Sequence, residues 1–176
     1  MSSIDHIPNV EFLGDAVPFV GRISEIIEAI KLFEDFEADE LGRLARYMRC
    51  YRAPLGTEII CEADDGDFML LLLNGSVEIV KKDVRGLPQI MATAGPGKTL
   101  GEMSLIDGAP RFASCVALDA VEFAVLDRDS LSRIIAEEPH IGVKLMTELL
   151  MLLNQRLRSV SKQLLDCLEA RRSRIR

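Results

Sequence analysis

The sequence predicts a mainly β protein with helices on both sides of the β region, and three observations support this. Between Cys50 and Asp127, short apolar runs alternate with turns rich in Gly, Pro, Asp and Asn, which is typical of an antiparallel sandwich or barrel. On the N-terminal side, apolar residues recur at helical spacing. On the C-terminal side, a long apolar repeat follows Pro139, a residue that suits a first helical turn.

The composition fits one folded domain with a helical extension. The chain has 176 residues, 48% of them hydrophobic, and a net charge of −7, so it is long enough to bury a core. Such an acidic chain is not expected to bind nucleic acid directly, because neutralising phosphates dominates that affinity. The arginine-rich tail, Arg171–Arg176, is interpreted as the solvated cationic end of a helix, and an acidic partner is the alternative.

The N-terminal part is predicted to be an arm followed by helices. Residues 1–21 contain two prolines and two glycines, and we expect an irregular arm there. Apolar spacing then predicts helices over Ile23–Leu32 and Glu37–Met48. We expect residues 1–32 to form an N-terminal arm and helix.

Residues 33–138 are expected to form the β domain. Asn74–Gly75 predicts a two-residue hairpin, and Asp129 is expected to cap a short helix that ends near Ala136. The predicted strands are Thr57–Cys61, Phe68–Leu73, Ser76–Val80, Gln89–Thr93, Ala113–Ala117 and Val121–Leu126.

Residues 139–176 are expected to form a coiled-coil helix and basic tail. One apolar row follows a heptad pattern, and it consists of Met146, Leu150, Leu153, Leu157, Val160, Leu164 and Cys167. A second row consists of Ile141, Leu145, Leu149 and Leu152. Because two apolar faces need two partners, we expect the second row to pack on the domain and the heptad row to form a parallel homodimer.

The stretch from Leu100 to Val116 carries the candidate chemistry. A short helix, Met103–Ile106, follows a Gly-Glu pair, and Gly and Pro end it immediately before Arg111. Free N–H groups at the helix start and the planar arginine fork suit phosphate oxygens. Glu102 adds one acceptor for a sugar hydroxyl. These three parts together suit a ribose phosphate of low charge.

This stretch resembles the phosphate-binding cassette of the cyclic nucleotide-binding domain family, and the resemblance extends from about Phe33 to the end of the long helix. It implies an eight-stranded jelly-roll barrel, or double-stranded β-helix, with its cassette at residues 100–116. It also implies that Glu102 binds the ribose 2′-hydroxyl of cAMP, that Arg111 binds the cyclic phosphate, and that no further cofactor is needed. The implied ligand-binding residues are Gly101, Glu102, Met103, Ser104, Arg111, Phe112 and Ala113.

Two features of the chain differ from the family pattern. Phe112 stands where a small or hydroxylated residue is usual, and since a phenyl ring offers no hydroxyl, cyclic GMP is disfavoured. Counting without gaps from Arg111 and Pro139, Arg156 and Leu157 take the base-reading positions of the catabolite activator-like branch. Arg156 can stack on a purine or form a hydrogen bond with it, and Leu157 can cover it. Alternatively, Arg156 is a flanking charge of the coiled coil, and neither residue contacts the base.

Enzyme classes fit the sequence less well. The segment Ala92–Thr99 ends in the Gly-Lys-Thr of a phosphate-binding P-loop, but Ala92 replaces the first glycine. A P-loop also needs a following helix within parallel crossover units, so we interpret Lys98 as a turn residue. His6 and His140 assemble into no plausible nucleophilic set. We therefore expect the protein not to be an enzyme.

The cysteines and apolar segments predict a cytoplasmic protein. Cys50, Cys61, Cys115 and Cys167 form no C-x-x-C pair, so zinc is not supported; their apolar flanks predict buried, reduced thiols. The N-terminus shows no signal-peptide pattern. The longest apolar run, Leu149–Leu153, is too short to cross a membrane.

The sequence therefore predicts a stand-alone cAMP-binding regulatory module. It would signal through its C-terminal dimer helix to an unidentified protein partner, and it would carry no appended DNA-binding domain. The alternative is a degenerate scaffold of the same fold that mediates protein–protein assembly without nucleotide. Phe112 discriminates between them: a ring that fills the pocket favours the scaffold, and a ring that packs outward or forms a wall favours the ligand.

Overall fold

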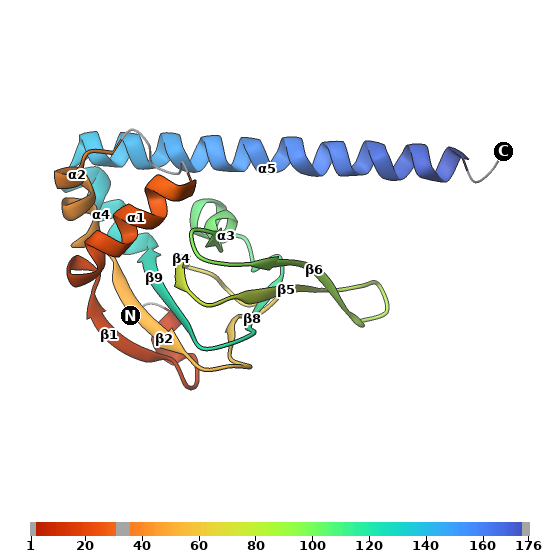
Figure 1. Ribbon diagram of the computed structural model, residues 1–176, viewed down its shortest axis with the longest axis horizontal. Helices are drawn as coiled ribbons and strands as arrows, with labels where there is room; N and C mark the ends of the chain where they lie inside the picture. Colours follow the sequence, from red (N-terminus) through yellow and green to blue (C-terminus); the bar gives the residue numbers. More distant parts are fainter. Residues whose placement is uncertain (1–2, 31–35, 174–176) are drawn as a thin grey trace.

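In the computed structural model, which describes residues 3–30 and 36–173, two antiparallel sheets carry a long C-terminal helix (Figure 1). The helices are η1 (Ser3–His6), η2 (Val17–Phe19), α1 (Val20–Ile30), α2 (Ala38–Ala45), α3 (Glu102–Asp107), α4 (Arg128–Glu137) and α5 (Pro139–Ser173). The strands are β1 (Glu11–Asp15), β2 (Arg49–Ala53), β3 (Glu58–Ile60), β4 (Phe68–Asn74), β5 (Val77–Lys82), β6 (Pro88–Ala94), β7 (Thr99–Leu100), β8 (Ser114–Ala117) and β9 (Val121–Asp127). The side chains of the arginine-rich tail, and Leu32 and Phe33, lie outside the described part.

The two sheets face one another, and β4 has apolar residues on both of its faces. The strand orders are β1-β2-β9-β4-β7 and β3-β8-β5-β6. Phe68, Leu70 and Leu72 of β4 belong to the core between the sheets, whereas Met69 and Leu71 belong to a second core shared with the helices. Side chains of a strand alternate between faces. A strand buried on both sides therefore has an uninterrupted apolar sequence.

The predicted mainly β fold with flanking helices is confirmed, but the N-terminal arm was wrongly predicted to be irregular. It contributes η1 and β1, which pairs with β2 at the edge of one sheet. The described residues thus form nine strands, one more than the resemblance implied. β1 escaped prediction because it is short, its register with β2 shifts between Phe12 and Gly14, and none of its residues is buried.

The predicted hairpin at Asn74–Gly75 is also wrong, because β4 and β5 lie in different sheets. The turn passes from one sheet to the other. Gly75 has φ +74°, and a Cβ there would lie 2.3 Å from Oδ1 of Asp119, so the position requires glycine. Asp119 accepts hydrogen bonds from the backbone and hydroxyl of Ser76. The hairpin of this region is formed by β5 and β6.

The helices that lead to the C-terminus begin close to their predicted positions. The cap of α4 is Asp127, not Asp129: its Oδ1 accepts the N–H of Ser130 at 2.8 Å, because β9 continues to Asp127 and the helix starts one residue later. Pro139 starts α5, which is about 50 Å long at the usual rise per residue.

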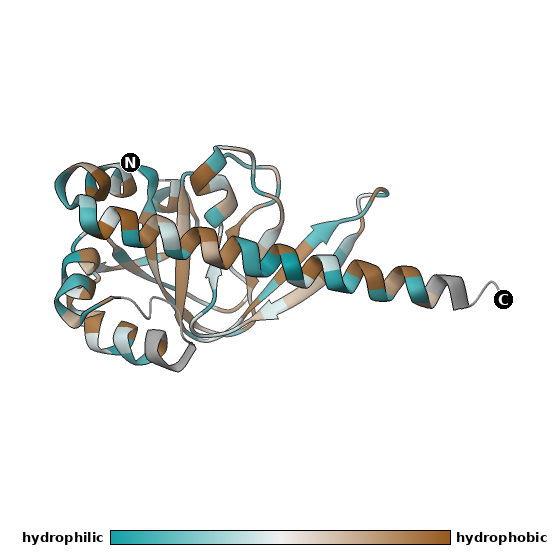
Figure 2. Cartoon of the chain, turned by 90° about the horizontal axis from the view of Figure 1, so that it is seen from above, coloured by the Kyte–Doolittle hydropathy of each residue, from teal (hydrophilic) through white to brown (hydrophobic). Residues whose placement is uncertain are grey.

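α5 has one buried face and one exposed face. Ile141, Leu145 and Leu149 of the predicted second row are buried in the core that the helices share. Most of the predicted heptad row is exposed, and hydrophobic residues recur along the part of α5 that extends beyond the sheets (Figure 2). A partly buried ion pair between Lys144 and Glu40 of α2, 2.6 Å between Nζ and Oε2, joins the start of α5 to α2.

The cysteines occupy different environments. Cys50 and Cys115 are buried, Cys61 is half-buried and Cys167 is exposed, so the prediction of buried thiols is wrong for Cys167. Cys167 lies on the part of α5 that extends beyond the sheets. Among the described residues, no cluster of three or more His, Cys, Asp or Glu side chains is arranged to hold a metal. In that same part of the chain, no helix combines the length and apolar character needed to cross a membrane.

Candidate functional site

The predicted cassette folds around α3, and glycines make its geometry possible. Gly101 precedes α3 with φ +84°, and Gly108 ends it with φ +70°. Both lie in the left-handed region that glycine adopts most readily. A Cβ on Gly101 would lie 2.6 Å from Nη1 of Arg111 and 2.9 Å from the carbonyl oxygen of Phe68. Gly101 is therefore required both by its backbone and by the arginine beside it.

Arg111 is buried, with 4% of its surface exposed. Its Nη1 donates to the carbonyl oxygens of Phe68 at 2.7 Å and Gly101 at 3.0 Å. Its guanidinium carbon lies 4.3 Å from the centroid of the Phe68 ring. Burial lowers the pKa of Arg111, and the nearby Asp67 opposes that change. Its Nη2 is buried without a partner among the described residues. Nη1 therefore holds the guanidinium in place, and Nη2 remains an unpaired donor.

Glu102 is 2% exposed, and its two oxygens differ. Oε1 forms an ion pair with Nη1 of Arg156 from α5. Oε2 is buried without a partner among the described residues. Arg156 also donates from Nη2 to the carbonyl oxygen of Thr99 at 2.7 Å and to its hydroxyl at 3.2 Å. Arg156 therefore contacts the cassette directly, and burial lowers its pKa.

These side chains meet at one cavity of about 130 Å³. Every predicted site residue except Leu157 lines it: Gly101, Glu102, Met103, Ser104, Arg111, Phe112, Ala113 and Arg156. Leu157 is 66% exposed on α5 and is not part of the wall. Four further lining residues were not predicted as site residues: Ile60, Ile79, Leu100 and Cys115. Leu100 was predicted only as the start of the cassette stretch. For the other three the only signal was alternation within predicted strands, which gives a face but not a cavity.

Phe112 is one of the residues that line this cavity. Its side chain is 53% exposed, so it does not fill the space. The Nζ of Lys81 lies 4.6 Å from the ring centroid. That ammonium is also paired with Oε1 of Glu62 at 2.6 Å. By the criterion set above, this position favours a ligand over a blocked pocket.

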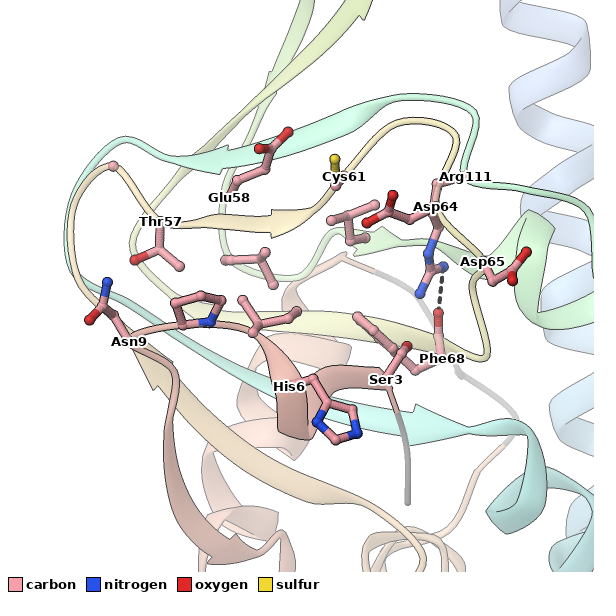
Figure 3. A pocket seen from close by; sticks show the side chains of 15 residues that line it. Ser3, His6, Asn9, Thr57, Glu58, Cys61, Asp64, Asp65, Phe68 and Arg111 are labelled. Carbon is pink, nitrogen blue, oxygen red and sulfur yellow. Dashed lines mark hydrogen bonds between the residues drawn. The ribbon is translucent and has the colours of Figure 1, made fainter.

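A larger hollow of about 550 Å³ lies on another side of Arg111, between β3 and the N-terminal segment (Figure 3). Figure 3 shows the guanidinium of Arg111 at its edge, bonded to the carbonyl of Phe68. Arg111 lines this hollow, but Glu102 and Arg156 are not among its lining residues. The smaller cavity, which has both Glu102 and Arg111 in its wall, is the candidate site.

Arg128 braces the cassette and was not predicted. Its Nη2 donates to the carbonyl of Ser104 at 2.6 Å and its Nε to that of Leu105 at 3.2 Å. A third bond reaches the carbonyl of Gly66 at 3.5 Å. With Asp129 taken as the cap, the sequence placed Arg128 before the helix, whereas the structure places it in the first turn of α4, where the dipole disfavours a cation. Such a residue needs a partner elsewhere, and here the partner is the end of α3.

The chain is similar to known proteins in sequence and in fold. Residues 52–138 match the family described as the cyclic nucleotide-binding domain. The chain is 28% identical over 144 residues to the CRP-like cAMP-activated global transcriptional regulator of Mycobacterium tuberculosis, covering 82% of this chain and 62% of that one. It is 34% identical over 109 residues to the cAMP-dependent protein kinase regulatory subunit of Aspergillus fumigatus, covering 62% of this chain and 26% of that one.

A solved structure matches nearly the whole chain. A crystal structure of a cyclic nucleotide-binding domain from Methylobacillus flagellatus KT is 42% identical, with a TM-score of 0.82, and the match covers 90% of this chain and 89% of that one. By contrast, the chain spans less than two thirds of the length of the curated relatives that it matches. These relatives are regulatory proteins by name.

Proposed function

This chain belongs to the cyclic nucleotide-binding domain family, and from that premise we propose that it is a cAMP-binding regulatory module that signals through α5. One observation carries the proposal. Among the described residues, three buried side-chain nitrogen or oxygen atoms lack a partner, and two of them are Oε2 of Glu102 and Nη2 of Arg111. Leaving such an atom unsatisfied costs about 1–3 kcal/mol. Glu102 and Arg111 line the same cavity, and a ligand with a donor and an anionic acceptor would satisfy both atoms.

A ribose cyclic phosphate has these two groups. The 2′-hydroxyl donates to Oε2 of Glu102, and a phosphate oxygen accepts from Nη2 of Arg111. Nη1 stays on its two carbonyl oxygens and keeps the fork in place. Gly101, Ser104 and Ala113 are the proposed backbone contacts, and Met103 lies beside them in the same wall. A cyclic phosphodiester has a single negative charge, which one arginine neutralises.

The same carboxylate links the ligand to α5. Oε1 of Glu102 is paired with Arg156, while Oε2 is left for the ribose. A ligand that forms a hydrogen bond with Glu102 therefore changes the ion pair that joins α5 to the cassette. A ligand shifts such an equilibrium only by its differential affinity for the two arrangements. Arg156 and Leu157, neighbours on α5, remain the proposed contacts for the base.

The exposed row on α5 supports a parallel homodimer as the output. Leu150, Leu157, Val160 and Leu164 are each more than half exposed in the single chain. Apolar residues at heptad spacing are typical of a two-stranded coiled coil. We assign residues 1–32 to the arm, 33–138 to the ligand domain and 139–176 to the dimer helix and tail. A downstream protein partner would bind the paired helices and respond to their position.

The ligand preference follows from Phe112. A scaffold without nucleotide would require its ring to occupy the cavity, but the ring is half-exposed and lies against Lys81. Because a phenyl ring has no hydroxyl for guanine, the proposed ligand is cAMP and not cyclic GMP. A regulatory role without catalysis fits the named relatives.

Isothermal calorimetry with cAMP and cyclic GMP tests the proposal. The wild type should bind one cAMP per chain and bind cyclic GMP more weakly. Arg111→Ala should lose about 2–5 kcal/mol of binding, since it leaves a desolvated phosphate unpaired. Arg85→Ala, in the exposed β5–β6 turn, is the matched control and should bind normally. Equal cAMP affinity in wild type and Arg111→Ala would refute the assignment.

A further inference from the structure

β3 lies at the open edge of its sheet, beside the larger hollow. The strand order β3-β8-β5-β6 places β8 on one side of β3 and no described strand on its other side. Figure 3 shows Thr57 and Glu58 on one side of the hollow, and His6 and Asn9 of the N-terminal segment on the other. No backbone hydrogen bond joins the described residues 3–9 to β3. Because an edge strand presents main-chain N–H and C=O groups that its sheet leaves unpaired, β3 can accept a further strand along the hollow.

The hollow has room for an extended polypeptide. Its volume of about 550 Å³ lies within the range of about 300–1,000 Å³ that is typical of ligand sites. β3, Glu58–Ile60, is about 10 Å long at the usual rise of a strand, so about three or four residues of another chain can lie beside it. Ile7 and Phe68 are among the lining residues. Since the side chains of a strand alternate between two sides, every second residue of an added strand can face these apolar walls.

The rim of the hollow is acidic. Glu58, Asp64 and Asp65 line it and are exposed. None of these carboxylates forms an ion pair within the described part of the chain. Among the described lining residues there is no lysine, and the single arginine, Arg111, is buried. Carboxylates of one sign in a cleft raise the local concentration of cations and repel anions, so the hollow favours a basic partner.

One end of the hollow contains a buried donor without a partner. Arg111 is 4% exposed, and Figure 3 shows its guanidinium pointing into the hollow. Its Nη2 has no hydrogen-bond partner among the residues that the structure describes. This nitrogen carries two N–H groups, so one can donate to the proposed phosphate and the other to an acceptor in the hollow. A main-chain carbonyl oxygen of an added strand is an acceptor of this kind.

We propose that the hollow between β3 and the N-terminal segment binds a basic, extended segment of a partner protein, which pairs with β3 as an added strand. Main-chain hydrogen bonds to an exposed sheet edge supply the affinity in this mode of recognition, and alternate side chains supply the specificity. The cationic side chains of the segment lie against the acidic rim, and its apolar residues face Ile7 and Phe68. This inference goes beyond the proposed function, because it concerns a different cavity and requires no nucleotide.

Nuclear magnetic resonance of the isotope-labelled full chain with the peptide acetyl-Arg-Ile-Arg-Ile-Arg-amide tests the inference. The amide signals of Ile59 and Ile60 should shift, and amide exchange in β3 should slow, because an added strand protects edge amides. Two control peptides carry N-methyl groups on the arginines only or on the isoleucines only. Alternate amides of a strand face the same side, so one control peptide should lose binding and the other should keep it.

A charge variant tests the acidic rim. The double variant Asp64→Asn/Asp65→Asn should weaken the peptide about tenfold, because two exposed ion pairs are lost. Asp166→Asn, at an exposed position of α5, is the matched control and should bind the peptide as the wild type does. Thermal unfolding should show that both variants are folded.

Three results would overturn the inference. The first is a peptide that shifts no amide signal of β3. The second is equal binding of both N-methylated peptides, which would show attraction between charges without strand pairing. The third is spermidine, a cation without a peptide backbone, producing the same shifts and the same protection of β3. Each of these results would leave the proposed nucleotide site standing, because that site is tested separately with cAMP.

Discussion

Gly66→Ala would displace the arginine of the site without altering any group that binds ligand. A Cβ on Gly66 would lie 2.3 Å from Nε and 2.5 Å from Cζ of Arg111. Gly66 does not have a positive φ, so alanine suits the backbone. The carbonyl of Gly66 is held by Arg128. The guanidinium must therefore retreat by about 1 Å to restore van der Waals distance.

That retreat has a calculable effect on binding and stability. Nη1 would leave carbonyl oxygens that it now reaches at 2.7 and 3.0 Å, and each unsatisfied carbonyl costs about 1–3 kcal/mol of folding free energy. Nη2 would no longer meet the phosphate. The loss of a desolvated charge pair costs about 2–5 kcal/mol of binding, and each 1.4 kcal/mol is a factor of ten. Gly66→Ala should therefore weaken cAMP binding at least about 30-fold.

Calorimetry with cAMP and thermal unfolding of the same preparations would measure both effects. Gly95→Ala is the matched control, because a Cβ there meets no atom within 4 Å and the residue has no positive φ. The control should bind and unfold as the wild type does. If Gly66→Ala binds cAMP within threefold of wild type, the arginine is not held as described and the reasoning fails.

Further predictions concern the ribose, the helix, the dimer and pH. Glu102→Gln should shrink the preference for cAMP over 2′-deoxy-cAMP by about 1–2 kcal/mol, because a charge-assisted bond becomes neutral; an unchanged preference in calorimetry would exclude Glu102 as the ribose acceptor. Arg156→Met should leave cAMP bound but abolish the ligand-dependent change in amide exchange along α5. If that change persists, ligand binding reaches α5 by contacts other than the Glu102–Arg156 ion pair. Leu157→Glu should convert a dimer to monomer in analytical ultracentrifugation, whereas a wild type that is monomeric would contradict the dimer. The Lys144 hydrogen bond lowers the pKa of Glu40 from 4.5. The difference in free energy of unfolding between wild type and Glu40→Gln should therefore be fully present above pH 4.5 and vanish as the pH falls through the lowered pKa. A difference that stays constant with pH in denaturant titrations would rule out this contribution.

The cassette could be predicted from sequence because its parts are local. Gly101, Glu102 and Arg111 lie within eleven residues, and glycines and a proline fix the turn between them. The counting of residues along an uninterrupted helix also placed Arg156 near the site. Its partner could not be deduced, because an ion pair across 54 residues depends on how α5 packs on the domain.

Features that depend on sheet assembly were missed or wrong. The Asn74–Gly75 signal reports only a tight reversal of the chain, and it cannot tell whether the two strands pair or enter different sheets. The contact between Lys81 and Phe112 joins a strand to the loop after α3, and no local pattern indicates it. β1 depends on pairing with β2 rather than on its own short sequence.

A crystal structure of the full chain with saturating cAMP would test the central claim most directly. The account predicts the nucleotide in the cavity beside α3, with its 2′-hydroxyl within hydrogen-bond distance of Oε2 of Glu102 and a phosphate oxygen within that distance of Nη2 of Arg111. Density for the nucleotide in the larger hollow beside β3, or a complex in which both atoms remain without partners, would contradict it.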